Sequence, residues 1–392
     1  MRRREFLTGL GATAAVLKTG LAQTTVGAPD AVQAELDRQV ATGLVAGCVC
    51  TTVGGRTWFG GRMRFDPPVP MRPDALFDLA SAAKTFTAGL CALLYAEGRL
   101  DPDAPFTDYL PEHVLAQERH GITVRDLATH TGGFDNAKPY IVADPVEFNR
   151  RLYAKRPVRP RGVAYDYACS NMIYLGRIVE HITGLDLESA AIKMLWRPLG
   201  MEETYWHNIP GNARAVEAMQ NGHPPIGFKG DEQARAYPAA MGNGAAFSCA
   251  ADMLRFVDDL RTRRTFPKAY YDLLSTPCFE KGAVRRSFGW DMGTAHRPAG
   301  WSEKTISHGG FTGVTIAVDP GNGYAGVVLT NRLGERLAGY AEELQRNGID
   351  IDPALISYGN FKQNDGYRCM KQLLAKRRTH PFSAVYVTSE MM

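Results

Sequence analysis

The sequence predicts an α/β (α+β) fold in which one antiparallel five-stranded sheet, flanked by helices, carries an all-helical insertion. Runs rich in β-branched and apolar residues stand at both ends of the chain, and the segment from about 112 to 270 reads as helix and loop. The runs are residues 45–53, 56–59, 305–308, 312–319 and 324–330. Strands at both ends with helices between them indicate a single sheet to which both ends contribute.

The composition is that of a globular protein. Of its 392 residues, 45% are hydrophobic and 22% are charged, which allows a sizeable core. The formal net charge of +4 is spread along the chain, so no nucleic-acid partner is expected. No apolar run is long enough for a stable membrane span. The seven cysteines show no paired C-x-x-C spacing, and no metal or other cofactor is expected.

The first 22 residues (1–22) predict an export signal. Three arginines at positions 2–4 precede Phe6 and Leu7, and a short apolar run then leads to small residues at 20–22. This order is typical of a twin-arginine signal, with a general secretory signal or a merely basic N-terminus as the alternatives. A periplasmic or secreted location is therefore expected.

A serine and a lysine stand at the head of a strongly apolar segment. Asp78 offers a side-chain cap, and residues 79–94 are apolar enough for a buried helix. The i, i+3 spacing of Ser81 and Lys84 places them on one face of that helix. Backbone N–H groups at a helix start favour a developing oxyanion. A lysine in apolar surroundings should have a lowered pKa, which suits it to activate a serine.

The S-x-x-K motif alone does not establish a catalytic site, because it is expected by chance about once in a chain of this length. Further catalytic residues must be found elsewhere in the chain. A histidine, His130, lies near the end of a helix that a pair of glycines terminates. We expect His130 to have a structural, hydrogen-bonding role rather than a catalytic one.

Four motifs occur in a definite order along the chain. They are the serine box at 79–85, a helix end at 125–133, a glycine loop and helix at 244–252, and His308-Gly309-Gly310. In this order they resemble the serine β-lactamase and penicillin-binding-protein-like hydrolase family, in its class C, D-alanyl carboxypeptidase and esterase branch. The resemblance covers about residues 30–332. It implies a β-lactamase/transpeptidase-like fold for a hydrolase domain at 23–332.

The family's second box, Y-x-N, has two possible positions here. Placing it at Cys169-Ser170-Asn171 deletes the tyrosine, whereas counting back from 175–176 places it at Tyr167. We prefer Tyr167. Cys169 then stands where asparagine or aspartate is usual, which puts contacts to a substrate amide in doubt.

The resemblance implies a mechanism through an acyl-enzyme. Ser81 would attack an acyl carbonyl, and Lys84 and Tyr167 would exchange its proton with the leaving group. The backbone N–H groups of Ser81 and Phe311 would form the oxyanion hole. A phenol acts as a base near neutral pH only where positive charge stabilises its anion.

The strand motif bears on the substrate. With Gly309 and Gly310, His308 stands where many members carry a lysine, a permanent cation for a substrate carboxylate. A histidine is mostly neutral at pH 7. Together with Cys169, this favours an esterase or an amide/D-peptide hydrolase acting on a small-molecule ester, amide or β-lactam-like substrate. The alternatives are a β-lactamase or D-alanyl-D-alanine carboxypeptidase, and a non-catalytic penicillin-recognising sensor. The oligomeric state is left open.

Residues 333–392 differ in character from the rest of the chain. A final helix of the hydrolase is expected at 335–347. Four stretches, at 336–340, 348–353, 366–367 and 381–387, resemble a fragment of the effector-binding domain of lac-repressor-type regulators. A partial lobe of this kind cannot close on a sugar, and no DNA-binding headpiece accompanies it. We therefore expect an appended extension rather than a sugar sensor or a transcription regulator.

Overall fold

The computed structural model describes residues 30–43, 45–54, 56–138, 142–218, 224–294 and 297–331. The predicted export signal, the predicted helix at 335–347 and the predicted extension lie outside these ranges.

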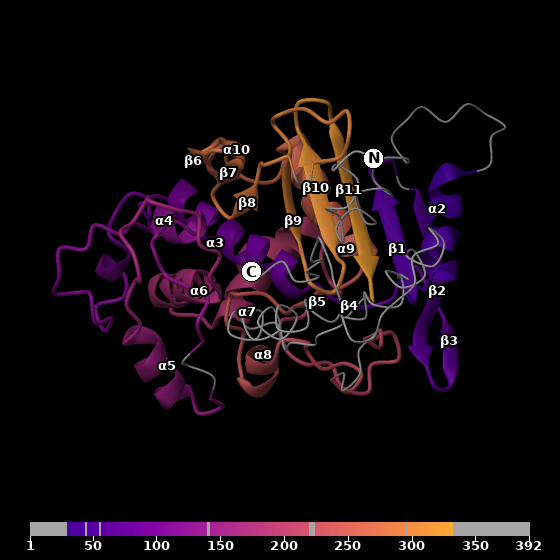
Figure 1. The fold of residues 1–392 in the computed structure, drawn as a ribbon, viewed down its shortest axis with the longest axis horizontal. Helices are drawn as coiled ribbons and strands as arrows, with labels where there is room; N and C mark the ends of the chain where they lie inside the picture. Colours follow the sequence, from indigo (N-terminus) through magenta and orange to yellow (C-terminus); the bar gives the residue numbers. More distant parts are fainter. Residues whose placement is uncertain are drawn as a thin grey trace, which may run out of the picture. The chain divides into compact units, whose positions relative to one another are not determined.

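One antiparallel sheet runs through the described part of the chain (Figure 1). Its strand order is β3-β2-β1-β11-β10-β9-β8-β7-β6. The strands are β1 (Gly47–Thr52), β2 (Thr57–Phe65), β3 (Pro68–Pro70), β6 (Phe279–Lys281), β7 (Val284–Ser287), β8 (Trp290–Asp291), β9 (Ile306–Gly309), β10 (Thr315–Asp319) and β11 (Tyr324–Thr330). The pairing of β1 with β11, which places Cys48 opposite Thr330, confirms that both ends of the chain build the sheet.

The sheet is wider than predicted. The five predicted strands form the contiguous set β2-β1-β11-β10-β9, and four short strands extend it to nine within the described residues. The additional strands are two to four residues long and carry prolines or charged side chains. Such segments lack the period-two apolar pattern by which a strand is recognised in sequence.

Helices and tight turns occupy most of the remaining described chain. The helices are α2 (Ala31–Ala41), α3 (Lys84–Ala96), α4 (Val124–Ala128), α5 (Pro145–Tyr153), α6 (Cys169–Thr183), α7 (Leu187–Ala191), α8 (Glu232–Ala236), α9 (Ala250–Thr262) and α10 (Lys268–Ser275). Short 3₁₀ turns are η1 (Ala80–Ala83), η2 (Phe106–Asp108) and η4 (Arg197–Leu199), and η3 (Ile192–Trp196) is a π turn. None of the helices in the described ranges is both long and apolar enough to span a membrane.

The predicted insertion is not wholly helical. It contains β5 (Phe247–Ser248), which pairs with β4 (Phe77–Asp78) immediately before the Ser81 turn. A two-residue strand carries no periodic signal, so this pairing is invisible in the sequence. It ties the insertion to the chain segment that leads into the candidate nucleophile.

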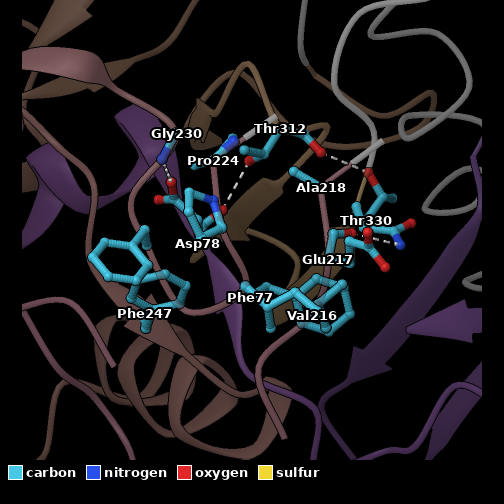
Figure 2. Close-up of a pocket in the computed structure, with 14 residues that line it drawn as sticks. Phe77, Asp78, Val216, Glu217, Ala218, Pro224, Gly230, Phe247, Thr312 and Thr330 are labelled. Carbon is cyan, nitrogen blue, oxygen red and sulfur yellow. Dashed lines mark hydrogen bonds between the residues drawn. The ribbon is translucent and has the colours of Figure 1, made fainter. Parts of the chain in front are cut away.

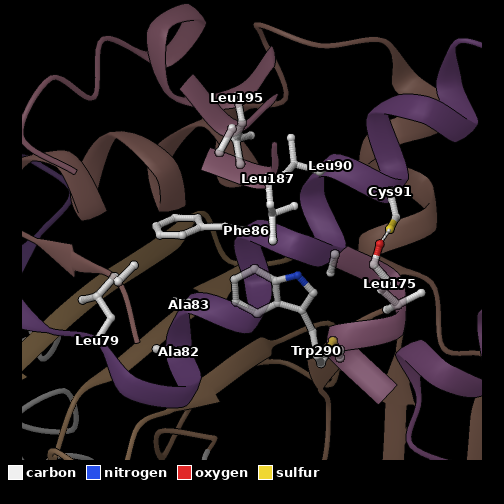
Figure 3. Packing of buried hydrophobic residues seen from close by; sticks show 14 of the residues in the cluster. Leu79, Ala82, Ala83, Phe86, Leu90, Cys91, Leu175, Leu187, Leu195 and Trp290 are labelled. Atoms are coloured by element: carbon white, nitrogen blue, oxygen red, sulfur yellow. Dashed lines mark hydrogen bonds between the residues drawn. The ribbon is translucent and has the colours of Figure 1, made fainter. Parts of the chain in front are cut away.

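Helix α3 lies at the centre of the main hydrophobic core. All its residues from 84 to 94 are buried, as the apolar sequence predicted. Phe86 packs edge-on against Trp196 and Phe256, with ring centroids 5.5 and 5.1 Å apart. Figure 3 shows leucines and Trp290 around the same helix. Burying one such aromatic side chain contributes roughly 1.5–3 kcal/mol, so the core holds α3 firmly in place.

Candidate active site

Ser81 lies on a tight turn rather than within the predicted α-helix. The turn is the 3₁₀ segment η1, and α3 begins only at Lys84. Ala80 has a φ of +45°, a left-handed conformation that is rare for a residue with a side chain. The predicted side-chain cap is not formed, because the N-cap residues of the turn and of α3 are Leu79 and Ala83. Oδ1 of Asp78 instead accepts a hydrogen bond from the N–H of Ala80 at 2.8 Å.

The turn brings Ser81 to Lys84 and Tyr167. Nζ of Lys84 donates a hydrogen bond to Oγ of Ser81 at 3.0 Å, and the hydroxyl of Tyr167 donates to the same oxygen at 2.8 Å. Nζ of Lys84 also donates to the carbonyl oxygen of Asn243, and it lies 5.0 Å from the centre of the Tyr167 ring. The three residues proposed for catalysis from the sequence therefore meet at one oxygen atom.

The expected direction of the Lys84 pKa shift was wrong. Burial does lower the pKa of Lys84, but the interactions with Cys169 and Tyr167 raise it by more, and its pKa lies above the usual value of 10.5. Local sequence showed only the apolar surroundings and not the two acidic groups that the fold places beside the amine. Lys84 is therefore a cation at neutral pH.

Cys169 is the first residue of α6 and is buried beside the site. Its N–H donates to Oδ1 of Asn136 at 2.9 Å. Cys169 interacts electrostatically with the ammonium groups of both Lys84 and Lys138, and Lys138 pairs with Asp231 at 3.1 Å. The cysteine thus occupies a positively charged corner next to Tyr167.

His130 supports Tyr167 from behind. It is fully buried, and Nδ1 accepts the N–H of Ala168 at 3.3 Å. Its ring centroid lies 4.7 Å from that of Tyr167. Burial holds the pKa of His130 well below 6.5, so the ring is neutral. These contacts belong to a structural residue that fixes the Tyr167 ring.

The end of strand β9 lies beside the Ser81 turn. Nδ1 of His308 donates to the carbonyl oxygen of Gly309 at 2.8 Å. A side chain at Gly310 would collide with the carbonyl oxygen of Leu79, so this position lies directly against the Ser81 turn. Phe311, which follows, is 53% exposed.

Two backbone donors are available for an oxyanion. Within the described part of the chain, neither the N–H of Ser81 nor that of Phe311 donates a hydrogen bond. The β9–β10 turn carrying Phe311 is tied to the Ser81 segment, because Oγ1 of Thr312 donates to the carbonyl oxygen of Asp78 at 2.9 Å. The two donors therefore lie on segments that this hydrogen bond holds together.

Sequence reasoning missed the groups that act through the backbone. From the sequence, no role at the site was expected for the glycine loop before α9, yet the carbonyl oxygen of Asn243 accepts a hydrogen bond from the Lys84 amine. Gly244 has a φ of +135°, and a side chain there would come within 2.6 Å of the carbonyl oxygen of Ala80. The glycines on both sides of Asn243 were the available signal, because they mark a close backbone approach.

No metal site is evident in the described residues, since no group of three or more His, Cys, Asp or Glu side chains could hold an ion. The six cysteines in those ranges are all unpaired thiols, and five of them are buried.

The sequence model of the Beta-lactamase family matches residues 29–348. The chain belongs to this family. Esterase EstB of Burkholderia gladioli is 27% identical over 320 residues, covering 69% of this chain and 81% of that protein. A Beta-lactamase of Escherichia coli (strain K12) is 28% identical over 233 residues, covering 57% of this chain and 59% of that protein. With the family match, these relatives identify the chain as a serine hydrolase.

A solved structure shares the fold. EstCE1, described as a hydrolase with promiscuous acyltransferase activity, superposes with a TM-score of 0.68 at 19% sequence identity. The alignment covers 87% of this chain and 99% of that one. The sheet and helices therefore form the β-lactamase/transpeptidase-like fold that the family resemblance implied.

Proposed function

We propose that the protein hydrolyses small esters, or amides of the D-peptide type, through an acyl-enzyme on Ser81. One observation carries the proposal: Oγ of Ser81 receives hydrogen bonds from both Lys84 and Tyr167. A serine hydroxyl needs a proton acceptor to become a nucleophile, and two ionisable groups at hydrogen-bond distance supply one.

The charges favour Tyr167 as that acceptor. Lys84 remains protonated, so it cannot take the proton, and its ammonium group lies 5.0 Å from the centre of the Tyr167 ring. The Tyr167 hydroxyl is 2.8 Å from Oγ of Ser81, within reach of the proton. Tyr167 would then receive the proton as Ser81 attacks and return it to the leaving group.

The tetrahedral oxyanion would be held by the N–H groups of Ser81 and Phe311. Each such donor is worth about 10²–10³ in rate. A water molecule would resolve the acyl-enzyme, with Tyr167 again acting as the base.

The substrate preference rests on His308, Cys169 and Phe311. His308 provides no permanent cation for a carboxylate, and Cys169 provides no side-chain amide or carboxylate. The Phe311 side chain is exposed beside the proposed oxyanion donor, where it can cover an apolar acyl group. The similarity to an enzyme named as an esterase supports the same preference.

A β-lactamase or D-alanyl-D-alanine carboxypeptidase is the second candidate, supported by the family match. A non-catalytic sensor would form the acyl-enzyme and release it negligibly. A panel of p-nitrophenyl butyrate, a D-amino-acid anilide and a chromogenic cephalosporin separates these functions. We expect steady turnover of the ester; a single stoichiometric burst would point to a sensor, and preference for the cephalosporin to a β-lactamase.

The matched variants for that panel are Ser81→Ala and Ser170→Ala. Ser170 is buried and, among the described residues, its hydroxyl has no hydrogen-bond partner. Ser81→Ala should abolish turnover and Ser170→Ala should retain it. Turnover by Ser81→Ala equal to that of the wild type would overturn the proposal.

We also propose that the chain is exported through its twin-arginine signal at 1–22 and that the segment after residue 348 is dispensable. Replacing Arg3 and Arg4 with lysines should keep the protein in the cytoplasm. A chain ending at residue 348, where the family match ends, should keep its activity.

A further inference from the structure

Asp78 connects three segments whose relative positions matter for the proposed reaction. Oδ1 accepts the N–H of Ala80 at 2.8 Å, and Oδ2 accepts the N–H of Gly230 at 2.7 Å. Its backbone carbonyl accepts the hydroxyl of Thr312 at 2.9 Å. One residue therefore ties the nucleophile turn, the loop at 229–231 and the strand end that carries Phe311. Figure 2 shows Asp78 between Gly230 and Thr312.

The turn that Asp78 holds does not have a relaxed backbone. Ala80 is left-handed, which costs a residue with a side chain of order 1 kcal/mol or more. Such a conformation persists only where neighbouring contacts impose it. The N–H of Ala80 is fixed by Asp78, and its carbonyl oxygen accepts the N–H of Ala245 at 2.9 Å. Ser81 comes next, so its hydroxyl and its N–H take their direction from this clamp.

The position requires a carboxylate. Both of its oxygens accept backbone N–H groups, whereas an asparagine of the same shape would turn its NH₂ group toward one of those donors. Asp78 is half-buried, and the buried side chain of Lys229 is close enough to interact with its charge. Desolvation raises the pKa of the Asp78 carboxyl above its usual value, while the N–H groups of Gly230 and Ala80 and the charge of Lys229 oppose this shift. Asp186, a helix cap elsewhere in the chain, is exposed.

We infer that Asp78 is a positioning residue for the hydrolysis: its carboxylate and backbone hold the Ser81 turn against the β9–β10 turn, so that the N–H groups of Ser81 and Phe311 converge on one oxyanion. This inference rests on the proposed function. Asp78 touches neither the substrate nor the reacting atoms, and it acts through Ala80, Gly230 and Thr312.

The role predicts a specific kinetic signature. Loss of oxyanion alignment weakens the transition state and not the bound substrate, so kcat should fall while KM stays nearly constant. A purely structural role would instead reduce the amount of folded protein and leave kcat per active site unchanged.

The test is Asp78→Asn in the full-length protein, with Asp186→Asn as the matched control. Asp186 caps α7 by accepting the N–H of Ser189 at 2.9 Å, so the control makes the same chemical change at a cap away from Ser81. Active sites are counted with a fluorophosphonate that labels Ser81, and kcat and KM are measured with p-nitrophenyl butyrate. We expect at least a tenfold loss of kcat per labelled site for Asp78→Asn, with KM within twofold, and no loss for Asp186→Asn.

A kcat per labelled site within twofold of the wild type would overturn the inference. If Asp78→Asn does not fold, kcat per labelled site is measured for Thr312→Val instead. This substitution removes only the hydroxyl that binds the Asp78 carbonyl. A loss of threefold or more is then expected, and an unchanged kcat overturns the inference. A wild-type protein that is labelled at Ser81 but turns over no ester contradicts the proposed function instead.

Discussion

The Tyr167 hydroxyl lies 2.8 Å from Oγ of Ser81, although 86 residues separate them in sequence. Tyr167 precedes α6 and Ser81 precedes α3, so the contact depends on the packing of these two buried helices against each other. The contact between the two hydroxyl groups is therefore a property of the tertiary fold.

Tyr167→Phe removes the proposed base and keeps the ring that packs on His130. We expect kcat for p-nitrophenyl butyrate to fall by about 10²–10⁴, with little change in the melting temperature. Tyr165→Phe is the control, because its ring also contacts His130 but its hydroxyl does not bind Ser81. A Tyr167→Phe enzyme that keeps a third or more of its kcat would exclude the tyrosine as base.

Gly310→Ala introduces a methyl group against the carbonyl oxygen of Leu79. The β9 end would have to move away from the Ser81 turn, taking the Phe311 donor with it. We expect kcat to fall by about 10²–10³, the usual effect of losing one oxyanion donor.

The control for this substitution is Gly60→Ala, in β2. Its nearest neighbour would be a carboxylate oxygen of Asp37 at 3.4 Å, an ordinary contact. Equal kcat values for the Gly310 and Gly60 variants would show that the two turns need not be in close contact.

His308→Lys restores the cation that many family members carry at this position. Hydrogen bonds to charged groups contribute about 1.5–3 kcal/mol, so kcat/KM for a carboxylate-bearing cephalosporin should rise about tenfold or more. The neutral ester should gain nothing, and His308→Gln should favour neither substrate. A gain of equal size for both substrates would show that position 308 does not select for substrate charge.

His113 makes stability depend on pH. It is 2% exposed, with Nδ1 accepting the N–H of Leu115 and Nε2 lying 3.2 Å from the Tyr174 hydroxyl. Burial lowers its pKa from 6.5 to about 4, so the folded protein keeps the ring neutral while the unfolded chain binds a proton. Its contribution to stability is complete above pH 6.5 and is lost as the pH falls from 6.5 towards 4.

At 1.36 kcal/mol per pKa unit, that loss amounts to roughly 3 kcal/mol. Urea unfolding of wild type and His113→Gln between pH 4 and 7 measures it. The variant should show a smaller decrease toward low pH, whereas the exposed His181→Gln should follow the wild type. Parallel pH curves for wild type and His113→Gln would contradict this account.

The sequence made two parts of the site predictable for different reasons. The pairing of Ser81 with Lys84 is local, because the two residues are three positions apart on a helical segment. Tyr167 was assigned only through the spacing to 175–176 within a family resemblance. The central five strands were also predictable, since each carries an apolar or β-branched run of its own.

Tertiary contacts account for what could not be predicted. The raised pKa of Lys84 depends on Cys169 and Tyr167, which no local pattern connects to it. The second oxygen of Asp78 binds Gly230, a contact 152 residues away in sequence. The short strands β6, β7 and β8 extend a sheet whose other strands already provide the hydrogen-bonding edge, so their own residues need little β-propensity.

The pairing of β1 with β11 also sets the order of events during biosynthesis. One edge of β1 remains unpaired until the strand ending at Thr330 leaves the ribosome, long after Ser81 has been made. Contacts between such distant segments form slowly, and open strand edges are prone to aggregation in the interval. We therefore expect nascent chains to depend on chaperones until β11 is inserted, and hydrolytic activity to appear only after Thr330 has left the ribosome.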